Sequence, residues 1–108
     1  MVDTYNKLVR DRIAELIRQQ GDHPEVEILD DSNYIKALNA KLYEEVDEYH
    51  VNYDVGELAD ILEVVRTIAI YNGLSPDELE QLRQKKYNER GGFNDKIFLT
   101  EVRRNATI

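Results

Sequence analysis

Apolar residues recur at intervals of three and four positions along three segments of the chain, the spacing that places side chains on one face of an α-helix. These segments cover about residues 10–20, 33–51 and 57–72. The third segment is apolar around much of its circumference, which predicts a place at the centre of the core. Residues 25–29 alternate weakly and are compatible with an extended segment, and residues 96–102 with a short strand or an arm.

A fourth helix is predicted from its boundary residues. Ser75 can cap a helix, Pro76 suits the first helical position, and Glu78 completes a capping box. A glycine pair then ends the helix after about Arg90. Four helices with short connections predict an all-α fold: a compact four-helix bundle with a short C-terminal extended arm.

The length and composition narrow the class of protein. The 108 residues suit one domain, and no repeat or linker divides them, so a single domain over residues 1–108 is expected. The chain has no cysteine, which excludes disulfides and thiolate metal sites. No window approaches eighteen uninterrupted apolar residues, and the N-terminus lacks the apolar stretch of a secretory signal. These features predict a cytoplasmic protein without a membrane span.

The formal charge of −8 is concentrated in one window. Residues 44–63 contain eight acidic residues and no lysine or arginine, and the other 88 residues carry 14 acidic and 14 basic residues. A uniformly acidic surface would indicate little more than solubility. Carboxylates concentrated in one place repel one another, so a local cluster of them instead requires a compensating positive charge. The distribution of acidic and basic residues also argues against nucleic-acid binding, because no stripe of basic residues offsets the negative potential of the acidic window.

The spacing of these acids suggests a metal site. Glu45 and Glu48 lie three apart on the second predicted helix, and Glu57 and Asp60 lie three apart on the third, so each pair shares a helix face. Helices joined by a short loop are expected to be antiparallel neighbours, which brings the pairs together. Four carboxylates beside a core favour a hard divalent cation, Mg²⁺ with Mn²⁺ as a substitute. The alternative interpretation is a solvated acidic face. The lack of lysine and arginine in the window argues against it, because the carboxylates then have no basic partners.

Other kinds of catalytic site find no support in the sequence. The zinc motif H-E-x-x-H, the EF-hand pattern, the Walker A loop and the G-x-S-x-G elbow are all absent. A di-iron bundle needs two Glu-x-x-His motifs, and the chain offers only Asp47 with His50. His23 and His50 are therefore interpreted as ordinary surface histidines.

Two basic clusters flank the acidic window. Lys7, Arg10 and Arg12 lie close together near the N-terminus, and Lys86 and Arg90 lie four apart near the end of the fourth helix. Cations at a helix C-terminus are favourable through the helix dipole alone. The alternative is capture of an anion, with lysine as a point charge and arginine as a fork for phosphate oxygens. Spacing does not decide between these two interpretations.

Four segments together resemble the MazG-like nucleoside triphosphate pyrophosphohydrolases, members of the all-α NTP pyrophosphatase superfamily. They are Y-N-K-L-V-R-D-R-I at 5–13, E-E-V-D-E at 44–48, E-L-A-D at 57–60 and K-Y-N-E-R-G-G-F at 86–93. The resemblance runs from about residue 5 to residue 99. It implies the all-α NTP pyrophosphatase type of four-helix fold and Mg²⁺-dependent hydrolysis of a nucleoside triphosphate at the α–β bond, giving NMP and pyrophosphate. Clearing unwanted nucleotides from the pool is the expected role.

The resemblance also implies roles for individual residues. Metal ligands are expected at Glu45, Glu48, Glu57 and Asp60, and Glu44 is expected to orient or deprotonate the attacking water, with Glu45 beside it in the catalytic motif. Substrate phosphates are expected to contact Lys86 and Arg90, and less directly Lys7, Arg10 and Arg12. A homo-oligomer, dimer or tetramer, is expected, with residues of a second chain near the pocket. Two alternatives remain: a non-catalytic helical module that binds nucleotide or protein, and a phosphoribosyl-ATP pyrophosphohydrolase.

Overall fold

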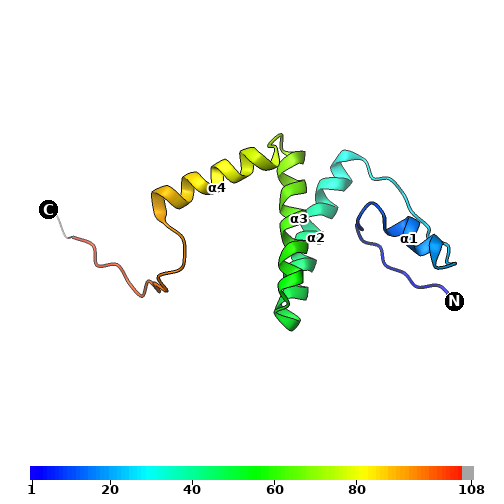
Figure 1. The fold of residues 1–108 in the computed structure, drawn as a ribbon, viewed down its shortest axis with the longest axis horizontal. Coiled ribbons are helices and arrows are strands. Elements are labelled where there is room, and N and C mark those ends of the chain that lie inside the picture. The colour runs from blue at the N-terminus through cyan, green and yellow to red at the C-terminus, as the bar shows by residue number, and fades with distance from the viewer. Residues whose placement is uncertain (106–108) are drawn as a thin grey trace.

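The computed structural model describes residues 1–105 and has four α-helices, with no strand in that part of the chain (Figure 1). They are α1 (Ile13–Gln19), α2 (Asp31–Asn52), α3 (Val55–Tyr71) and α4 (Pro76–Arg90). The all-α class is therefore confirmed. Residues 25–29 and 96–102 have no regular secondary structure, so the strand alternative for 96–102 is wrong. The last three residues of the predicted 1–108 domain lie outside the described residues.

The centre of the molecule is an antiparallel hairpin of α2 and α3 (Figure 1). Only Tyr53 and Asp54 connect the two helices. Tyr53 adopts a left-handed conformation with φ 53°, and its backbone N–H donates to the carbonyl of Tyr49, which closes α2. The carboxylate of Asp54 then accepts from the backbone N–H of Gly56 and starts α3. This short connection fixes which residues of the two helices face each other.

Side chains from both helices form a small core. Leu38 of α2 is 2% exposed and Val64 of α3 is 8% exposed. As predicted, α3 is central, because it packs against both α2 and α4. Another face of α3 is open, however: the exposed fractions of Leu58, Leu62 and Ile70 are 45%, 52% and 57%. A single chain therefore leaves part of its most apolar helix in contact with solvent.

The prediction of a compact bundle is wrong for the single chain. The molecule measures 71 × 32 × 26 Å, and its radius of gyration of 19.7 Å well exceeds the roughly 13 Å of a compact domain of this size. Figure 1 shows α4 leaving the hairpin at the end of α3 and carrying the C-terminal arm away from it. Within residues 1–105, α4 packs only against α3, and α1 packs against no other helix. Neither α1 nor α4 has a buried residue, and for α4 the reason is its composition, because its sequence is strongly polar and offers few apolar side chains for docking.

The start of α4 follows the sequence prediction closely. Ser75 Oγ accepts from the backbone N–H of Glu78 at 3.1 Å, and the Glu78 carboxylate accepts from the Ser75 N–H at 3.2 Å. Pro76 occupies the first turn, as expected from its fixed backbone angle. This capping box fixes the start of α4 through local hydrogen bonds. Like the other described helices, α4 lacks the combination of length and hydropathy needed to cross a membrane.

Candidate metal centre

The hairpin brings carboxylates from two helices together. One carboxylate oxygen from each of Glu45, Glu57 and Asp60 lies within 4.8 Å of the others. A second group with the same spacing contains Glu44, Glu45 and Glu48. The two groups share Glu45, so the four ligand positions expected from sequence form one continuous cluster together with Glu44. The structure thus brings Glu45 of the first acidic pair close to both members of the second pair, and Glu48 joins the cluster through Glu45.

Two oxygens in this cluster lack hydrogen-bond partners. Glu45 is only 6% exposed, and its Oε2 atom is buried without a partner. The Oε2 atom of Glu57 is likewise buried and unpaired. Buried carboxylate oxygens are normally hydrogen-bonded or bound to a cation, because leaving them unpaired costs free energy. Unpaired oxygens on both sides of the hairpin therefore point to a positively charged ligand between the helices.

The electrostatics of Glu57 give the same indication. Loss of hydration raises its pKa, and the neighbouring charges of Glu48 and Asp60 raise it further. Repulsion among these carboxylates is the direct cause of the last two contributions. A cation bound in the cluster would relieve it.

The donor set fits Mg²⁺ or Mn²⁺. All the available ligand atoms are carboxylate oxygens, which hard divalent cations prefer. Bonds of about 2.0–2.1 Å to one Mg²⁺ ion bring two ligand oxygens to roughly 4 Å or less. The 4.8 Å limit of the present spacing requires only a small closing movement of flexible side chains.

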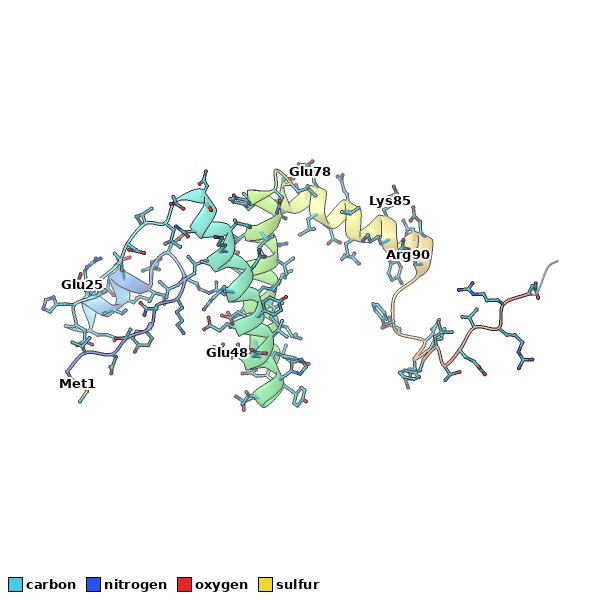
Figure 2. The ribbon with its side chains drawn as sticks, turned by 180° about the vertical axis from the view of Figure 1, so that it is seen from behind. Met1, Glu25, Glu48, Glu78, Lys85 and Arg90 are labelled. Atoms are coloured by element: carbon cyan, nitrogen blue, oxygen red, sulfur yellow. The ribbon has the colours of Figure 1, made fainter. Side chains whose placement is uncertain are left out.

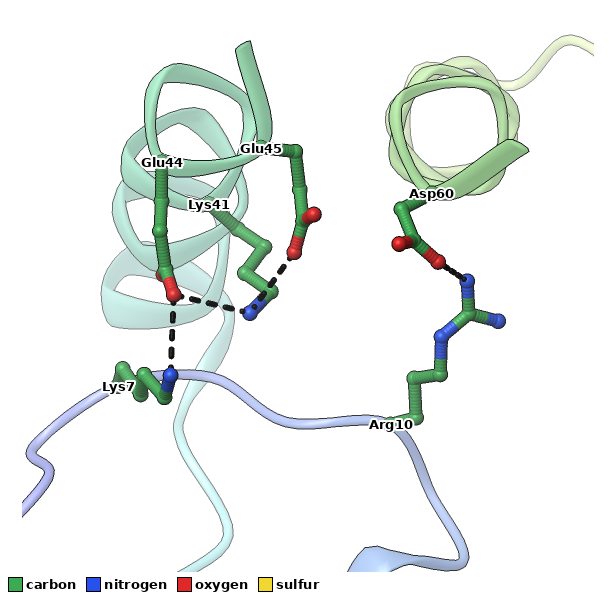
Figure 3. A network of polar contacts seen from close by, with 6 residues as sticks. All are labelled: Lys7, Arg10, Lys41, Glu44, Glu45 and Asp60. Atoms are coloured by element: carbon green, nitrogen blue, oxygen red, sulfur yellow. Dashed lines mark hydrogen bonds and ion pairs between the residues drawn. The ribbon is translucent and has the colours of Figure 1, made fainter. Parts of the chain in front are cut away.

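Three basic side chains pair with these acids, which corrects the expectation that they lack basic partners. Lys41 Nζ lies 3.1 Å from Glu45 Oε1 and 3.4 Å from Glu44 Oε1 (Figure 3). Lys7 Nζ lies 3.1 Å from Glu44 Oε1. Lys41 was missed because it precedes the acidic window, although its spacing of three and four residues to the two glutamates places it on their helix face.

The N-terminal segment before α1 supplies a further pair. Arg10 Nη2 lies 2.6 Å from Asp60 Oδ1, while Lys7 reaches Glu44 from the same segment (Figure 3). The family resemblance predicts that both cations contact substrate phosphates, and in this structure they contact the carboxylate cluster. The N-terminal segment therefore connects to both helices of the hairpin.

These contacts control the ionisation of Glu44. Burial alone would raise its pKa, but the Lys7 hydrogen bond and the Lys41 charge outweigh burial and lower the pKa below the ordinary value. The pKa of Lys41 is raised, because its contacts with Glu45 and Glu44 outweigh its own desolvation. Both groups are therefore held in their charged forms.

A cavity of about 450 Å³ adjoins the cluster. Glu45 and Asp60 lie in its wall beside the cations Arg10, Arg12 and Lys41. The rest of the wall consists of the apolar and aromatic residues Leu8, Val9, Tyr34, Leu38 and Val64, together with Asp11, Glu63 and Thr67. The volume lies within the roughly 300–1,000 Å³ typical of small-molecule sites. With four carboxylates against three cations, this wall would suit an anionic ligand only together with a bound cation, and its apolar side would suit an apolar portion of that ligand.

The other predicted site residues lie apart from the carboxylates. Figure 2 shows Arg90, on the outlying α4, well away from Glu48. Lys86 and Arg90 have no ion pair within residues 1–105, and Arg90 lines a separate cavity with Gly91 and Phe93. Arg12 pairs with Glu15 at 3.4 Å. A single chain therefore does not bring the second basic cluster to the acidic one.

Neither histidine belongs to the carboxylate groups found in residues 1–105. His23 is exposed, and His50 is exposed beside the rings of Tyr49 and Tyr53, with centroid distances of 5.8 and 6.1 Å. Their interpretation as surface residues agrees with these positions.

Comparison with known proteins gives a short match. No family model and no solved structure matches the chain. An uncharacterized protein of Mycolicibacterium smegmatis is 57% identical over 42 residues, which covers 39% of this chain and 43% of that relative. The chain thus matches less than half the length of this relative, whose name carries no activity. A function must be argued from the site itself.

Proposed function

We propose that the chain is a Mg²⁺-dependent nucleoside triphosphate pyrophosphohydrolase of the MazG-like type, which cleaves the α–β bond and releases NMP and pyrophosphate. The observation that carries the proposal is the meeting of Glu45, Glu57 and Asp60 across the hairpin, with two buried oxygens unpaired. When bound, Mg²⁺ supplies the charge that offsets the carboxylates, polarises phosphoryl oxygens and favours deprotonation of the attacking water. The motif resemblance adds the reaction class.

Each side chain has a distinct part in this proposal. Glu45, Glu48, Glu57 and Asp60 hold the cation on a rigid two-helix platform. Glu44, next to them, accepts a hydrogen bond from the attacking water. Its lowered pKa suits this orienting role better than that of a strong base, because a general base works best with a pKa near the operating pH.

The adjoining cavity supports a nucleotide as the substrate. A triphosphate carries about four negative charges. Once a cation offsets the carboxylates, Arg10, Arg12 and Lys41 in the cavity wall can donate hydrogen bonds to its phosphate oxygens. The ring of Tyr34 and the aliphatic side chains beside it offer surface for the nucleoside. Lys86 and Arg90 complete the phosphate contacts from a neighbouring chain.

The proposed assembly is a homo-oligomer. Its support is the open face of α3, where Leu58, Leu62 and Ile70 are about half exposed. Large apolar side chains exposed along one helix are a feature that a protein–protein interface would cover. A second copy that covers this face can also bring its own α4 toward the carboxylates.

The test is hydrolysis of standard and oxidised or methylated nucleoside triphosphates, ribo and deoxy, with mass spectrometry of the products. We expect NMP and pyrophosphate in Mg²⁺ and none in EDTA, and loss of turnover in Asp60→Asn. Asp47→Asn is the matched control, because Asp47 is exposed on α2 and belongs to neither carboxylate group. In H₂¹⁸O, label in NMP reports attack at the α-phosphorus, and label in pyrophosphate reports attack at the β-phosphorus.

Several outcomes would contradict the proposal. Metal-dependent binding of nucleotide without turnover on any substrate would favour the non-catalytic module. Turnover of phosphoribosyl-ATP alone would favour the related pyrophosphohydrolase. Undiminished activity of Asp60→Asn would remove the site assignment.

Arg10→Gln is expected to raise the KM for the triphosphate about tenfold, because one charge-assisted contact with phosphate is lost. Mg²⁺ affinity is expected to be no weaker, since the pair between Arg10 and Asp60 engages a candidate ligand. Steady-state kinetics at saturating Mg²⁺ and a separate metal titration measure the two effects. Arg18→Gln, on the exposed surface of α1, is the control. An unchanged KM would show that Arg10 serves the carboxylates alone.

A further inference from the structure

Lys41 is a largely buried cation in contact with two glutamates of the carboxylate cluster. Its side chain is only 15% exposed, and its ammonium group lies between the Oε1 atoms of Glu44 and Glu45, at 3.4 and 3.1 Å (Figure 3). All three residues belong to α2, so the helix itself sets their spacing. The contact therefore does not depend on the position of the N-terminal segment, unlike the pairs of Lys7 and Arg10.

The two oxygens of Glu45 have different environments as a result. Oε1 is engaged by Lys41, while Oε2 is buried without a partner. A carboxylate held at one oxygen loses rotational freedom about its terminal bond. The second oxygen is then held in one orientation, in a carboxylate that has an oxygen within 4.8 Å of oxygens of Glu57 and Asp60. Metal-ligating carboxylates are commonly held by such outer contacts.

We propose that Lys41 is a positioning residue that fixes the Glu45 carboxylate for binding of a divalent cation between α2 and α3. The inference rests on the metal site of the proposed function and adds to it a residue outside the resembling motifs. Lys41 also carries a charge of the same sign as the cation. Positioning of Glu45 by Lys41 raises the affinity for the cation, and charge repulsion by Lys41 lowers it. Whether removal of the Lys41 charge weakens or strengthens metal binding therefore separates the two effects.

The test measures Mn²⁺ affinity without any nucleotide, from the signal of free Mn²⁺ in electron paramagnetic resonance. Lys41→Met, which keeps the aliphatic stem, is expected to weaken Mn²⁺ binding about 10–100-fold, the range seen when outer partners of metal ligands are removed. Lys41→Arg keeps a cationic donor and is expected to restore most of the affinity. Lys36→Met, at an exposed position of the same helix, should bind as the wild type does.

Equal or tighter Mn²⁺ binding by Lys41→Met would overturn the proposal, because repulsion would then dominate. Circular dichroism and thermal unfolding in EDTA establish that each variant is folded. Lys41→Gln is a second variant that keeps a polar head group, and its Mn²⁺ affinity must also fall. A purely structural role would lower the metal-free melting temperature without rescue of affinity by arginine, and this result would also overturn the proposal.

A separate variant keeps this test distinct from that of the proposed function. Glu45→Gln is expected to lose Mn²⁺ binding, and retention of wild-type affinity in that variant would mean that the metal site itself is misassigned. Mn²⁺ binding that depends on Lys41, in a protein that hydrolyses no nucleotide, would leave the positioning role standing and remove the pyrophosphohydrolase.

Discussion

Glu57→Gln is expected to lower Mg²⁺-dependent turnover at least about a hundredfold and to remove the stabilisation of the fold by divalent metal. The variant keeps the size of the side chain but replaces a charged ligand oxygen by an amide. Charge stabilisation by a catalytic metal is worth several kcal/mol, and each 1.4 kcal/mol corresponds to a factor of ten in rate. Product formation and the melting temperature with and without Mg²⁺ measure the two effects.

The same substitution is expected to raise stability in EDTA, and the gain depends on pH. Burial and the charges of Glu48 and Asp60 raise the pKa of Glu57. A carboxyl group whose pKa is higher in the folded state destabilises the fold once it ionises, so the cost develops as pH rises above the ordinary value of 4.5. The difference in melting temperature between Glu57→Gln and the wild type should therefore be largest at neutral pH and should close toward pH 4.5.

Glu25→Gln is the control, because Glu25 is an exposed glutamate far from the cluster (Figure 2). It should leave turnover and metal stabilisation unchanged. An equal response of both variants to Mg²⁺ would mean that the acids form a solvated face without a bound cation.

Mixing two inactive variants is expected to restore activity if neighbouring chains share a site. The first is the double variant Lys86→Ala/Arg90→Ala, which should lower turnover by at least about a hundredfold, because the negative charge on the departing pyrophosphate loses its cationic partners. Combined with Glu57→Gln in a freely exchanging dimer, half of the dimers are mixed, and each contains one intact site. About a quarter of wild-type activity should return.

The matched control is a mixture of Glu57→Gln with Asp60→Asn. Both residues belong to the same carboxylate group, so each site in a mixed dimer retains one defect, and no activity should return. Light scattering measures the oligomeric state, and exchange is followed with differently tagged chains. Exchange without recovery of activity in the first mixture would show that α4 does not complete a neighbouring site.

The helices and the meeting of the acidic pairs were predictable because both follow from local rules. Apolar spacing and the capping residues determine where α2, α3 and α4 form. The two-residue connection between α2 and α3 makes these two helices run antiparallel, side by side. Once they do, Glu45 must lie near Glu57 and Asp60. The site in its outline is therefore a consequence of helix geometry and loop length.

The placement of α4 and the counter-charges could not be predicted in this way. The sequence contains a fourth helix but no apolar stripe on it broad enough to dock against the hairpin, so counting helices suggested a bundle that the single chain does not form. Arg10 and Asp60 are fifty residues apart, and no local pattern relates them. The contact of Lys41 with Glu44 and Glu45, by contrast, follows from helix spacing, although Lys41 lies outside the acidic window of residues 44–63.

The ion pairs around the cluster also set its electrical balance. Five carboxylates lie together, those of Glu44, Glu45, Glu48, Glu57 and Asp60, and the cations of Lys7, Arg10 and Lys41 contact them. The formal charge that remains is −2, the amount that a single divalent ion neutralises. One bound divalent ion would thus balance the charge of these eight groups with every ion pair in place. Uptake of a second ion would leave excess positive charge until an anion arrives, so its binding would be coupled to that of the substrate.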